Sequence, residues 1–296
     1  MGRGKDLKMK MSIKSVVFAL GFLLCSSAFG NEPLLWEIEG TGKVYLLGST
    51  HVGRKEMYPL AESIIKAYDE ADSLVLEADI DPENIRRYYY IGRFEKGKTL
   101  QDVLSYKKLW QLKEEMGEIG LDYEQHKTLK PWVIAIMITE KKISNIGYPP
   151  GFEIETYFYL KAKRDNKELE ELEGYSFLFE LLDSLSKEEQ MTFLQDSYEN
   201  ISELEDDLEE LFKSWDNGDV DRIYKLFMKE GAGFEVEDLM ANLYGTRTLA
   251  MLDKMEGYLE EDKTRFVIVG GGHIMGDDGL IKKLEDKGYK VKRFRN

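Results

Sequence analysis

Two short apolar runs, one near each end of the chain, constrain the fold most. Each has the length and composition of a buried strand and ends in glycine: VYLLG at 44–48 and FVIVG at 266–270. A helical pattern and a further apolar run follow each of them, SLVLE at 73–77 and YKVKRF at 289–294. Strand–helix–strand units imply parallel pairing, and a strand–turn–strand pattern at 34–47 precedes the first unit. The sequence therefore predicts an α/β fold whose mixed central sheet is built from two related β-α-β halves.

The middle of the chain is predicted to be a helical insertion. Helical patterns cover about 82–165 and 175–260, and a weaker strand candidate, ELEEL at 168–172, lies between them. The acidic run ELEDDLEELF is typical of a solvated helix face. No stretch has the composition of a linker, so we expect residues 31–296 to form one domain.

The first 30 residues have the layout of a secretory signal peptide. Basic residues precede an apolar run from Val16 to Leu24, and small residues follow up to Gly30. The apolar run is shorter than the roughly 20 residues that a membrane-spanning helix needs. We therefore expect cleavage after residue 30, export to the periplasm or the cell exterior, and no stable membrane span in the processed chain.

The charge and cysteine content exclude several classes of protein. The chain has 41 Lys and Arg against 56 Asp and Glu, a net charge of −15, and its first 30 residues hold five of these bases and one acid. The remainder therefore carries −19, which argues against nucleic-acid binding. Its single cysteine, Cys25, lies in the predicted signal peptide. Thiol catalysis and iron–sulfur clusters are excluded for the processed chain, and any metal must be held by histidine, carboxylate, hydroxyl or backbone groups.

Two of the three histidines share one pattern. His51 closes GSTH and His273 closes GGGH, each directly after one of the two apolar strands. Gly48 and Gly270 allow the backbone to approach a ligand closely, so we expect them to contact substrate. In parallel sheets, ligands bind beyond the carboxyl ends of the strands, where both histidines are expected. His126 has no such context and is predicted to be structural or at the surface.

Acidic residues end two further strands at the same edge. Glu77 closes SLVLE, and Glu173 closes ELEELE. Two imidazoles with one or two carboxylates suit a divalent transition metal that keeps an open coordination position. The alternative is that these are hydrogen-bonded structural residues and surface acids. Arg247, in YGTRTLAM, is expected either to form an ordinary salt bridge or to fix a carboxylate or a reaction oxyanion.

These segments together resemble the TraB/GumN family. The resemblance is carried by GSTHVGRKEMYPL, SLVLEAD, KPW, LEELEG, TRTLAM and FVIVGGGHIMGDDGLIKKLEDKGYKV, which occur in the family's order. That family includes the Tiki metalloproteases and is more distantly similar to ChaN-like and erythromycin-esterase-like proteins. The resemblance implies metal-dependent hydrolysis with manganese or cobalt favoured and zinc as a further option.

Residue by residue, the resemblance implies roles for individual positions. It makes His51, Glu77 and His273 metal ligands, and it matches Arg247 and Glu173 to polar positions that we expect to be catalytic. The chain departs from the family pattern in three places, with Gly174 in place of Thr, Glu153 in place of Asp, and Thr248 in place of Asn. Glu153 is taken as a candidate substrate contact.

The sequence therefore predicts an exported metal-dependent hydrolase, a peptidase acting on a peptide or protein substrate. In this prediction Glu173 is a further ligand or the general base, and Arg247 stabilises the oxyanion. One alternative is a non-catalytic binding protein that sequesters a peptide signal or haem at the same site, lined by the tyrosine-rich stretch 86–94. Another is an esterase-like enzyme in which a histidine acts as general base without metal.

Overall fold

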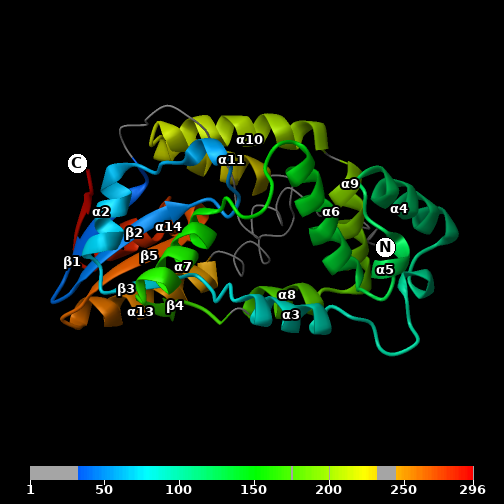
Figure 1. Ribbon diagram of the computed structural model, residues 1–296, viewed down its shortest axis with the longest axis horizontal. Helices are drawn as coiled ribbons and strands as arrows, with labels where there is room; N and C mark the ends of the chain where they lie inside the picture. The colour runs from blue at the N-terminus through cyan, green and yellow to red at the C-terminus, as the bar shows by residue number, and fades with distance from the viewer. Residues whose placement is uncertain (1–32, 175, 200, 232–244, 296) are drawn as a thin grey trace, which may run out of the picture.

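A computed structural model describes residues 33–295 of the chain, apart from 175, 200 and 232–244. The predicted signal peptide, residues 1–30, lies outside the described residues. The structure has a sheet-containing part and a mainly helical part, side by side along the long axis (Figure 1). None of the helices in the described ranges is both long and apolar enough to cross a membrane.

A mixed sheet of six strands forms the core of the first part, which confirms the predicted fold class. The strand order is β4-β3-β5-β2-β1-β6. The first four of these strands are mutually parallel, whereas β1 runs antiparallel to both β2 and β6. The strands are β1 (Leu35–Glu39), β2 (Lys43–Ser49), β3 (Ser73–Leu76), β4 (Glu168–Glu171), β5 (Thr264–Gly270) and β6 (Lys290–Arg293).

The direction of the chain connections decides which helices cover which face. The connections β2 to β3 and β3 to β4 run one way across the sheet, while β4 to β5 and β5 to β6 run the other way. Crossovers between parallel strands are almost always right-handed, so the two directions place their helices on opposite faces. Accordingly α2 (Glu62–Glu70) and α7 (Ile154–Asp165) cover one face, and α13 (Arg247–Glu260) and α15 (Leu280–Asp286) belong to the other (Figure 1).

The two predicted β-α-β units interleave in this sheet. The strands of the first unit, β2 and β3, flank β5, and those of the second, β5 and β6, are separated by β2 and β1. Both units therefore share one continuous set of strands, and no boundary in the sheet separates one half from the other. Their origin from a duplicated half stays a prediction.

The helical insertion forms the second part of the molecule. Helix α6 packs on α9, α3 on α8, and α4 on α5, while α10 and α11 pack together along the top of the view (Figure 1). The expected helix over 236–259 begins at Arg247 within the described residues, and 236–244 lie outside them. The remaining elements are η1 (Lys55–Met57), α3 (Pro82–Ile91), η2 (Leu100–Asp102), α4 (Tyr106–Glu118), α5 (Tyr123–His126), α6 (Pro131–Asn145), α8 (Ser176–Ser184), α9 (Lys187–Glu199), α10 (Ile201–Asp216), α11 (Val220–Gly231) and α14 (Gly271–Ile274).

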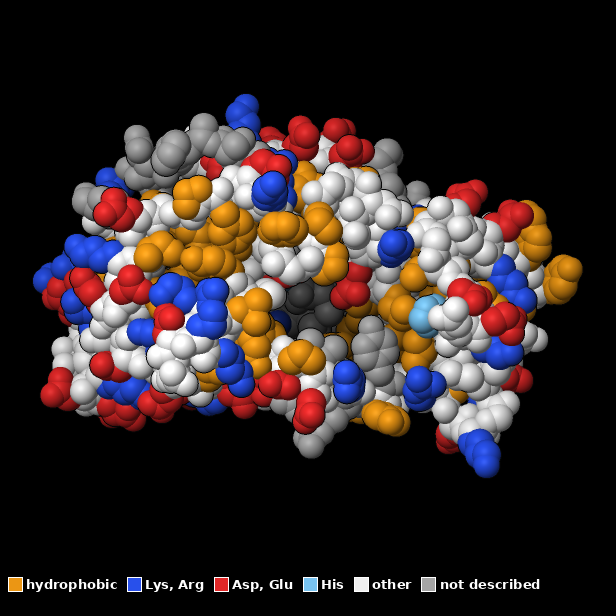
Figure 2. Space-filling model, in the orientation of Figure 1, with side chains coloured by type: hydrophobic (Ala, Val, Ile, Leu, Met, Phe, Trp, Pro, Cys, Tyr) orange, Lys and Arg blue, Asp and Glu red, His pale blue; other side chains and the backbone are white. Residues whose placement is uncertain are grey.

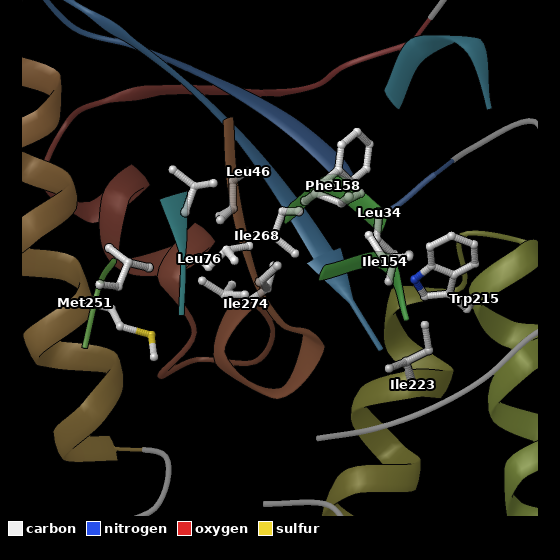
Figure 3. Packing of buried hydrophobic residues seen from close by; sticks show 14 of the residues in the cluster. Leu34, Leu46, Leu76, Ile154, Phe158, Trp215, Ile223, Met251, Ile268 and Ile274 are labelled. Carbon is white, nitrogen blue, oxygen red and sulfur yellow. The ribbon is translucent and has the colours of Figure 1, made fainter. Parts of the chain in front are cut away.

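Apolar side chains from the sheet and from the helices around it meet in one core. Figure 3 shows Leu46, Leu76 and Ile268 of the strands beside Ile274 of α14, with Trp215 of α10 at the other side of the cluster. The indole Nε1 of Trp215 donates to the carbonyl of Gly48 at 3.1 Å. The core therefore joins the carboxyl end of β2 to a helix of the insertion.

The packing of α7 on the sheet depends on one aromatic side chain. Phe158 is fully buried, and its ring lies 5.0 Å from Tyr68 of α2 and 4.9 Å from Phe266 of β5, centroid to centroid. We expect Phe158→Ala to lower the free energy of unfolding by about 3–5 kcal/mol, because a large cavity replaces these contacts. Leu160→Ala on the same helix is the matched control: Leu160 is 54% exposed, so its change should stay within about 0.5 kcal/mol. Equal losses in chemical denaturation would contradict the assigned packing.

Candidate functional site

The carboxyl ends of the four parallel strands bring the predicted polar residues together. In sheet order, Glu173 follows β4, Glu77 follows β3, His273 follows β5, and His51 follows β2. Glu77 contacts both histidines, and Arg247 links Glu77 to Glu173, so side-chain contacts connect all four strand ends. In Figure 1 this edge faces the middle of the molecule, where the helical part begins, and Figure 2 shows a hollow in the surface of that region.

The two histidine segments leave the sheet at a point where the chain direction diverges. After β2 the chain passes to α2 on one face, and after the adjacent β5 it passes through α14 to α15 on the other. Such a switch point opens a crevice at the carboxyl edge of an open parallel sheet and is the usual place for a ligand. The position of His51 and His273 at this switch explains why two separate segments with the same pattern form one site.

Glu77 lies at the centre of the cluster and is 8% exposed. Its Oε2 accepts a hydrogen bond from the backbone N–H of Gly270 at 2.9 Å and lies 3.5 Å from Nε2 of His51. Its Oε1 lies 3.6 Å from Nε2 of His273 and accepts a hydrogen bond from Nη2 of Arg247. Each carboxylate oxygen therefore faces the Nε2 atom of a different histidine.

A second carboxylate holds the His51 ring. Nδ1 of His51 lies 2.7 Å from Oε1 of Glu155, at the start of α7, and the same oxygen accepts a hydrogen bond from Ser49 Oγ. The Glu155 residue is 5% exposed. The His51 side chain is 26% exposed, so it lies on the accessible side of the cluster. Because Nδ1 is occupied by Glu155, Nε2 is the nitrogen that His51 directs toward Glu77.

Thr248 holds the ring of His273 as Glu155 holds that of His51. Oγ1 of Thr248, on α13, lies 2.8 Å from Nδ1 of His273, and both residues are buried. His273 lies on α14, a single turn of helix that begins directly after β5 and that the sequence patterns did not predict. Both histidines therefore have Nδ1 against a polar side chain from a flanking helix, α7 or α13, and Nε2 toward Glu77.

Arg247 joins the two strand-end acids. Its Nε donates to the two oxygens of Glu173 at 3.1 and 2.8 Å, and its Nη2 contacts both Glu77 and Glu173. Arg247 is 6% exposed and begins α13. The guanidinium therefore fixes the spacing of two carboxylates that would otherwise repel each other in a buried place.

Burial and charge shift the titration of these groups in different directions. Burial lowers the pKa of His51, but Glu155 and Glu77 outweigh it and raise that pKa to about 10. Burial lowers the pKa of His273 to about 4, so this ring is neutral. Burial raises the pKa of Glu77, but Arg247 and the two histidines hold it well below its usual range. Burial raises the pKa of Glu173 in spite of its contact with Arg247.

The three residues predicted to contact substrate, Gly270, Gly48 and Glu153, lie in different surroundings. A Cβ atom at Gly270 would lie 3.0 Å from Nε2 of His51, so the glycine leaves this space to the cluster. Gly48 is buried, and a Cβ there would meet Leu34 and Ile274 of the core. Glu153 accepts hydrogen bonds from the N–H of Gly151 at the start of α7. Of the three, only Gly270 contacts the cluster directly in the structure.

Two other predicted features lie away from the cluster. His126 ends α5 in the helical part, where burial lowers its pKa. Residues 86–91 of the tyrosine-rich stretch lie in α3, which packs on α8, and Tyr90 is 76% exposed. Among the side chains that the structure describes, neither feature supplies a contact to the strand-end residues.

Glu155 and Ser49 are the contributions that the sequence analysis missed. Glu155 lies three residues before Phe158 and seven before Ala162, so it shares the buried face of α7 with them. A carboxylate on the apolar face of a helix is poorly explained by packing, and this was the available signal. In this segment the sequence patterns pointed instead to Glu153, two residues earlier, as the substrate contact.

Gly53 brings the His51 segment against the start of α7. A Cβ atom at Gly53 would lie 1.7 Å from the carbonyl oxygen of Phe152 and 2.8 Å from the backbone nitrogen of Glu153. No side chain fits there without moving backbone, and this close approach places Glu155 beside His51. The approach is reinforced by Tyr58, whose hydroxyl donates to the Phe152 carbonyl at 2.9 Å.

We therefore expect Gly53→Ala to destabilise the protein by about 1–3 kcal/mol, through forced separation of two backbone segments. Gly117→Ala in α4 is the control, because a Cβ there meets nothing within 4 Å and alanine favours helix, giving a gain of about 0.5–1 kcal/mol. Thermal or chemical denaturation of both variants measures the difference. A neutral effect of Gly53→Ala would show that the two segments are not in contact.

Comparison with known proteins places the chain among uncharacterized relatives. An uncharacterized protein of Treponema pallidum (strain Nichols) is 22% identical over 296 residues, covering 90% of this chain and 87% of that protein. The uncharacterized protein YbaP of Escherichia coli (strain K12) and that of Shigella flexneri are each 26% identical over 137 residues, which cover 46% of this chain and 50% of theirs. No solved structure matches the chain significantly.

The model of the TraB/PrgY/gumN family matches residues 34–293. That range takes in both G-x-x-H segments, the two strand-end acids and the helix that carries Arg247. On this match across nearly all of the described residues, the chain belongs to the TraB/PrgY/gumN family.

Proposed function

We propose that the chain is an exported metal-dependent hydrolase whose ion is held by His51, His273 and Glu77. One observation carries this proposal: both histidines have Nδ1 engaged by a partner, Glu155 or Thr248, and direct Nε2 toward the two oxygens of Glu77. A metal-binding histidine usually has its second nitrogen fixed by a carboxylate, hydroxyl or carbonyl in this way. Two histidines buried only for packing would not require the same arrangement twice around one carboxylate.

The donor types suit an ion of the manganese, cobalt or zinc type, and their spacing is close to that of bound ligands. Atoms bound at about 2.1 Å to one such ion lie about 3.0–3.4 Å from each other. The two Nε2–carboxylate separations, 3.5 and 3.6 Å, are slightly longer than that. Within the part of the chain that the structure describes, no three His, Cys, Asp or Glu side chains form a closed metal-binding group. A small inward movement of the imidazoles is therefore part of the proposal.

The local charge also favours a cation. The cluster holds three carboxylates and one guanidinium: Arg247 pairs with Glu77 and Glu173, and Glu155 pairs with His51. The raised pKa of His51 means that its ring carries a proton in the metal-free protein, and an ion bound at Nε2 would displace that proton. The acids would then outnumber the bases by two, which is the charge that a divalent ion would balance. Buried carboxylates need such compensation because isolated buried charges are strongly disfavoured.

The chain's own residues supply the remaining chemistry. A divalent ion at this place would polarise a carbonyl group and lower the pKa of water. Glu173, whose pKa burial raises, would accept a proton from that water and return it to the leaving amine. Arg247 would hold Glu173 and Glu77 at a fixed spacing, since its Nε and Nη2 point at these acids. This positioning role replaces oxyanion stabilisation as our proposal for Arg247.

The proposed substrate is a peptide or an exposed protein terminus. Amide hydrolysis requires both an activated water and a proton donor for the amine, and the cluster offers groups for each. The resemblance to the Tiki metalloproteases favours the same substrate class. The binding-protein alternative makes a different prediction. Under that alternative the protein binds metal and peptide but does not hydrolyse the peptide.

The metal assignment is tested by the three histidines of the chain. We expect His51→Ala and His273→Ala each to lose bound manganese or cobalt, and His126→Ala to retain it, since His126 lies on α5. Elemental analysis of protein purified without a tag, with thermal stability in added manganese, measures this. Saturating metal should raise the melting temperature of the wild type and of His126→Ala only. Equal metal content in all four proteins would refute the assignment.

The two partners of the Nδ1 atoms provide a second test. We expect Glu155→Gln and Thr248→Val each to weaken metal binding by about 10- to 100-fold, because the ring that each residue orients becomes free to turn. Thr139→Val is the matched control, a buried threonine on α6 whose hydroxyl bonds to the Ala135 carbonyl. Calorimetric titration with manganese gives the three affinities. Unchanged affinity in both site variants would show that Glu155 and Thr248 are structural only.

A further inference from the structure

The last paired residues of β2 and β5, Ser49 and Gly270, each hold one of the two carboxylates that contact His51. These residues face each other across the two strands. The backbone N–H of Gly270 donates to Oε2 of Glu77, which lies near Nε2 of the imidazole. Oγ of Ser49 donates to Oε1 of Glu155, which lies 2.7 Å from Nδ1. The imidazole therefore lies between two carboxylates that are tied to a single pair of residues in the sheet.

The two carboxylates are supported to different degrees. Glu77 directly follows β3 and accepts hydrogen bonds from a guanidinium and from a backbone N–H of β5. Glu155 comes instead from α7, and the buried Oε2 of its carboxylate has no hydrogen-bond partner among the described residues. Its Oε1 is held by the His51 ring and by the Ser49 hydroxyl. Because the ring is the group to be oriented, Ser49 is the donor that can fix Glu155 independently of it.

The position of Glu155 in α7 gives its carboxylate a competing place to bind. Glu155 lies in the first turn of this helix, where the free backbone N–H groups and the helix dipole attract negative charge. In the described part of the chain, the N-cap residue Glu153 makes no side-chain hydrogen bond to those groups. Ser49 opposes this attraction from a rigid support, since it is 2% exposed and ends a strand that is paired on both sides. Without the Ser49 hydroxyl, we expect the Glu155 carboxylate to turn toward its own helix.

We propose that Ser49 is a positioning residue of the metal site and acts through Glu155 to fix the orientation of the His51 ring. A serine hydroxyl donates to a carboxylate, and an ionised carboxylate can only accept. The same oxygen therefore takes the N–H of Nδ1 and leaves Nε2 for an ion. The proposal rests on the proposed function for the ion itself, but the orientation of the ring can be measured in metal-free protein.

A purely structural Ser49 would only satisfy its own hydroxyl at the buried end of β2. Ser73 provides the matched case, because it is also buried in a parallel strand and its Oγ donates to Oε1 of Glu170 at 2.5 Å. Ser73 begins β3, so it lies at the opposite end of the sheet from the strand-end cluster. Loss of either hydroxyl should lower stability by a similar amount. Only loss of the Ser49 hydroxyl should affect the metal site.

Calorimetric titration with manganese measures the effect on the metal site. We expect Ser49→Ala to weaken binding by about 3- to 10-fold, the fold-change that the loss of one hydrogen bond produces. Ser49→Thr keeps the hydroxyl and should restore most of the affinity, and Ser73→Ala should bind like the wild type. In the Glu155→Gln variant, Ser49→Ala should weaken binding little further, because residues that act through one contact are not additive.

The orientation of the ring is measured in metal-free protein by NMR. The chain has three histidines, so selective nitrogen-15 labelling of histidine resolves their ring signals. We expect the Nδ1–H proton of His51 to exchange with water at the same rate in the wild type and in Ser73→Ala, and faster by about 3- to 10-fold in Ser49→Ala. Ser49→Cys has nearly the same size but a weak S–H donor, so it should fall between them and replaces Ser49→Ala if that variant folds poorly.

The outcomes separate this proposal from the proposed function. Unchanged manganese affinity and unchanged Nδ1–H exchange in Ser49→Ala, or the same losses in Ser73→Ala, would overturn the role of Ser49. Additive losses in the double variant would show that Ser49 does not act through Glu155 and would overturn it as well. If the wild type binds no metal but Ser49→Ala still speeds the exchange, the proposed function fails and the positioning of His51 by Ser49 stands.

Discussion

The buried carboxylate of Glu77 is the interaction on which the rest of the site depends. Glu77 directly follows β3 and is held by the backbone of β5 through Gly270, by α13 through Arg247, and by the two imidazoles on either side. A carboxylate buried to this extent is stable only if every oxygen is compensated. The surrounding strands and helices must therefore place hydrogen-bond donors around this one carboxylate. This requirement brings together residues separated by almost 200 positions in the chain.

The sheet topology makes this convergence possible. Four parallel strands present their carboxyl ends at one edge, and the change of direction between β2 and β5 opens that edge. The segments beyond the sheet then complete the site from both faces, α7 by Glu155 and α13 by Thr248 and Arg247. The helical insertion contributes α10, whose Trp215 and Phe212 contact the segment that runs from Gly48 to Arg54. Sheet, flanking helices and insertion thus act on one short segment.

Sequence patterns predicted the sheet and its polar edge because both follow from local chemistry. Apolar runs that end in glycine are strands, and parallel strands must share an edge, so the convergence of His51, Glu77, Glu173 and His273 could be expected before the structure. The apolar face of α7 could mark Glu155 as unusual, but it could not show its partner. The roles of Glu155 and Gly53 come from a contact between α7 and the β2 segment that no local pattern encodes. The interleaving of the two β-α-β units could not be predicted from the sequence for the same reason, because strand order depends on crossovers between distant segments.

The two histidines are placed alike but are not equivalent, and the difference orients the site. His51 is partly exposed and paired with a carboxylate, whereas His273 is buried and paired with a neutral hydroxyl. The more accessible side of the cluster is therefore that of β2, while the proposed proton acceptor Glu173 lies beyond β4. Adjacent strands are about 4.8 Å apart, so the three intervals from β4 to β2 span about 14 Å. An extended peptide covers that distance with about four residues, so a substrate lying across this edge would reach from the His51 side to Glu173 with a short segment of its chain.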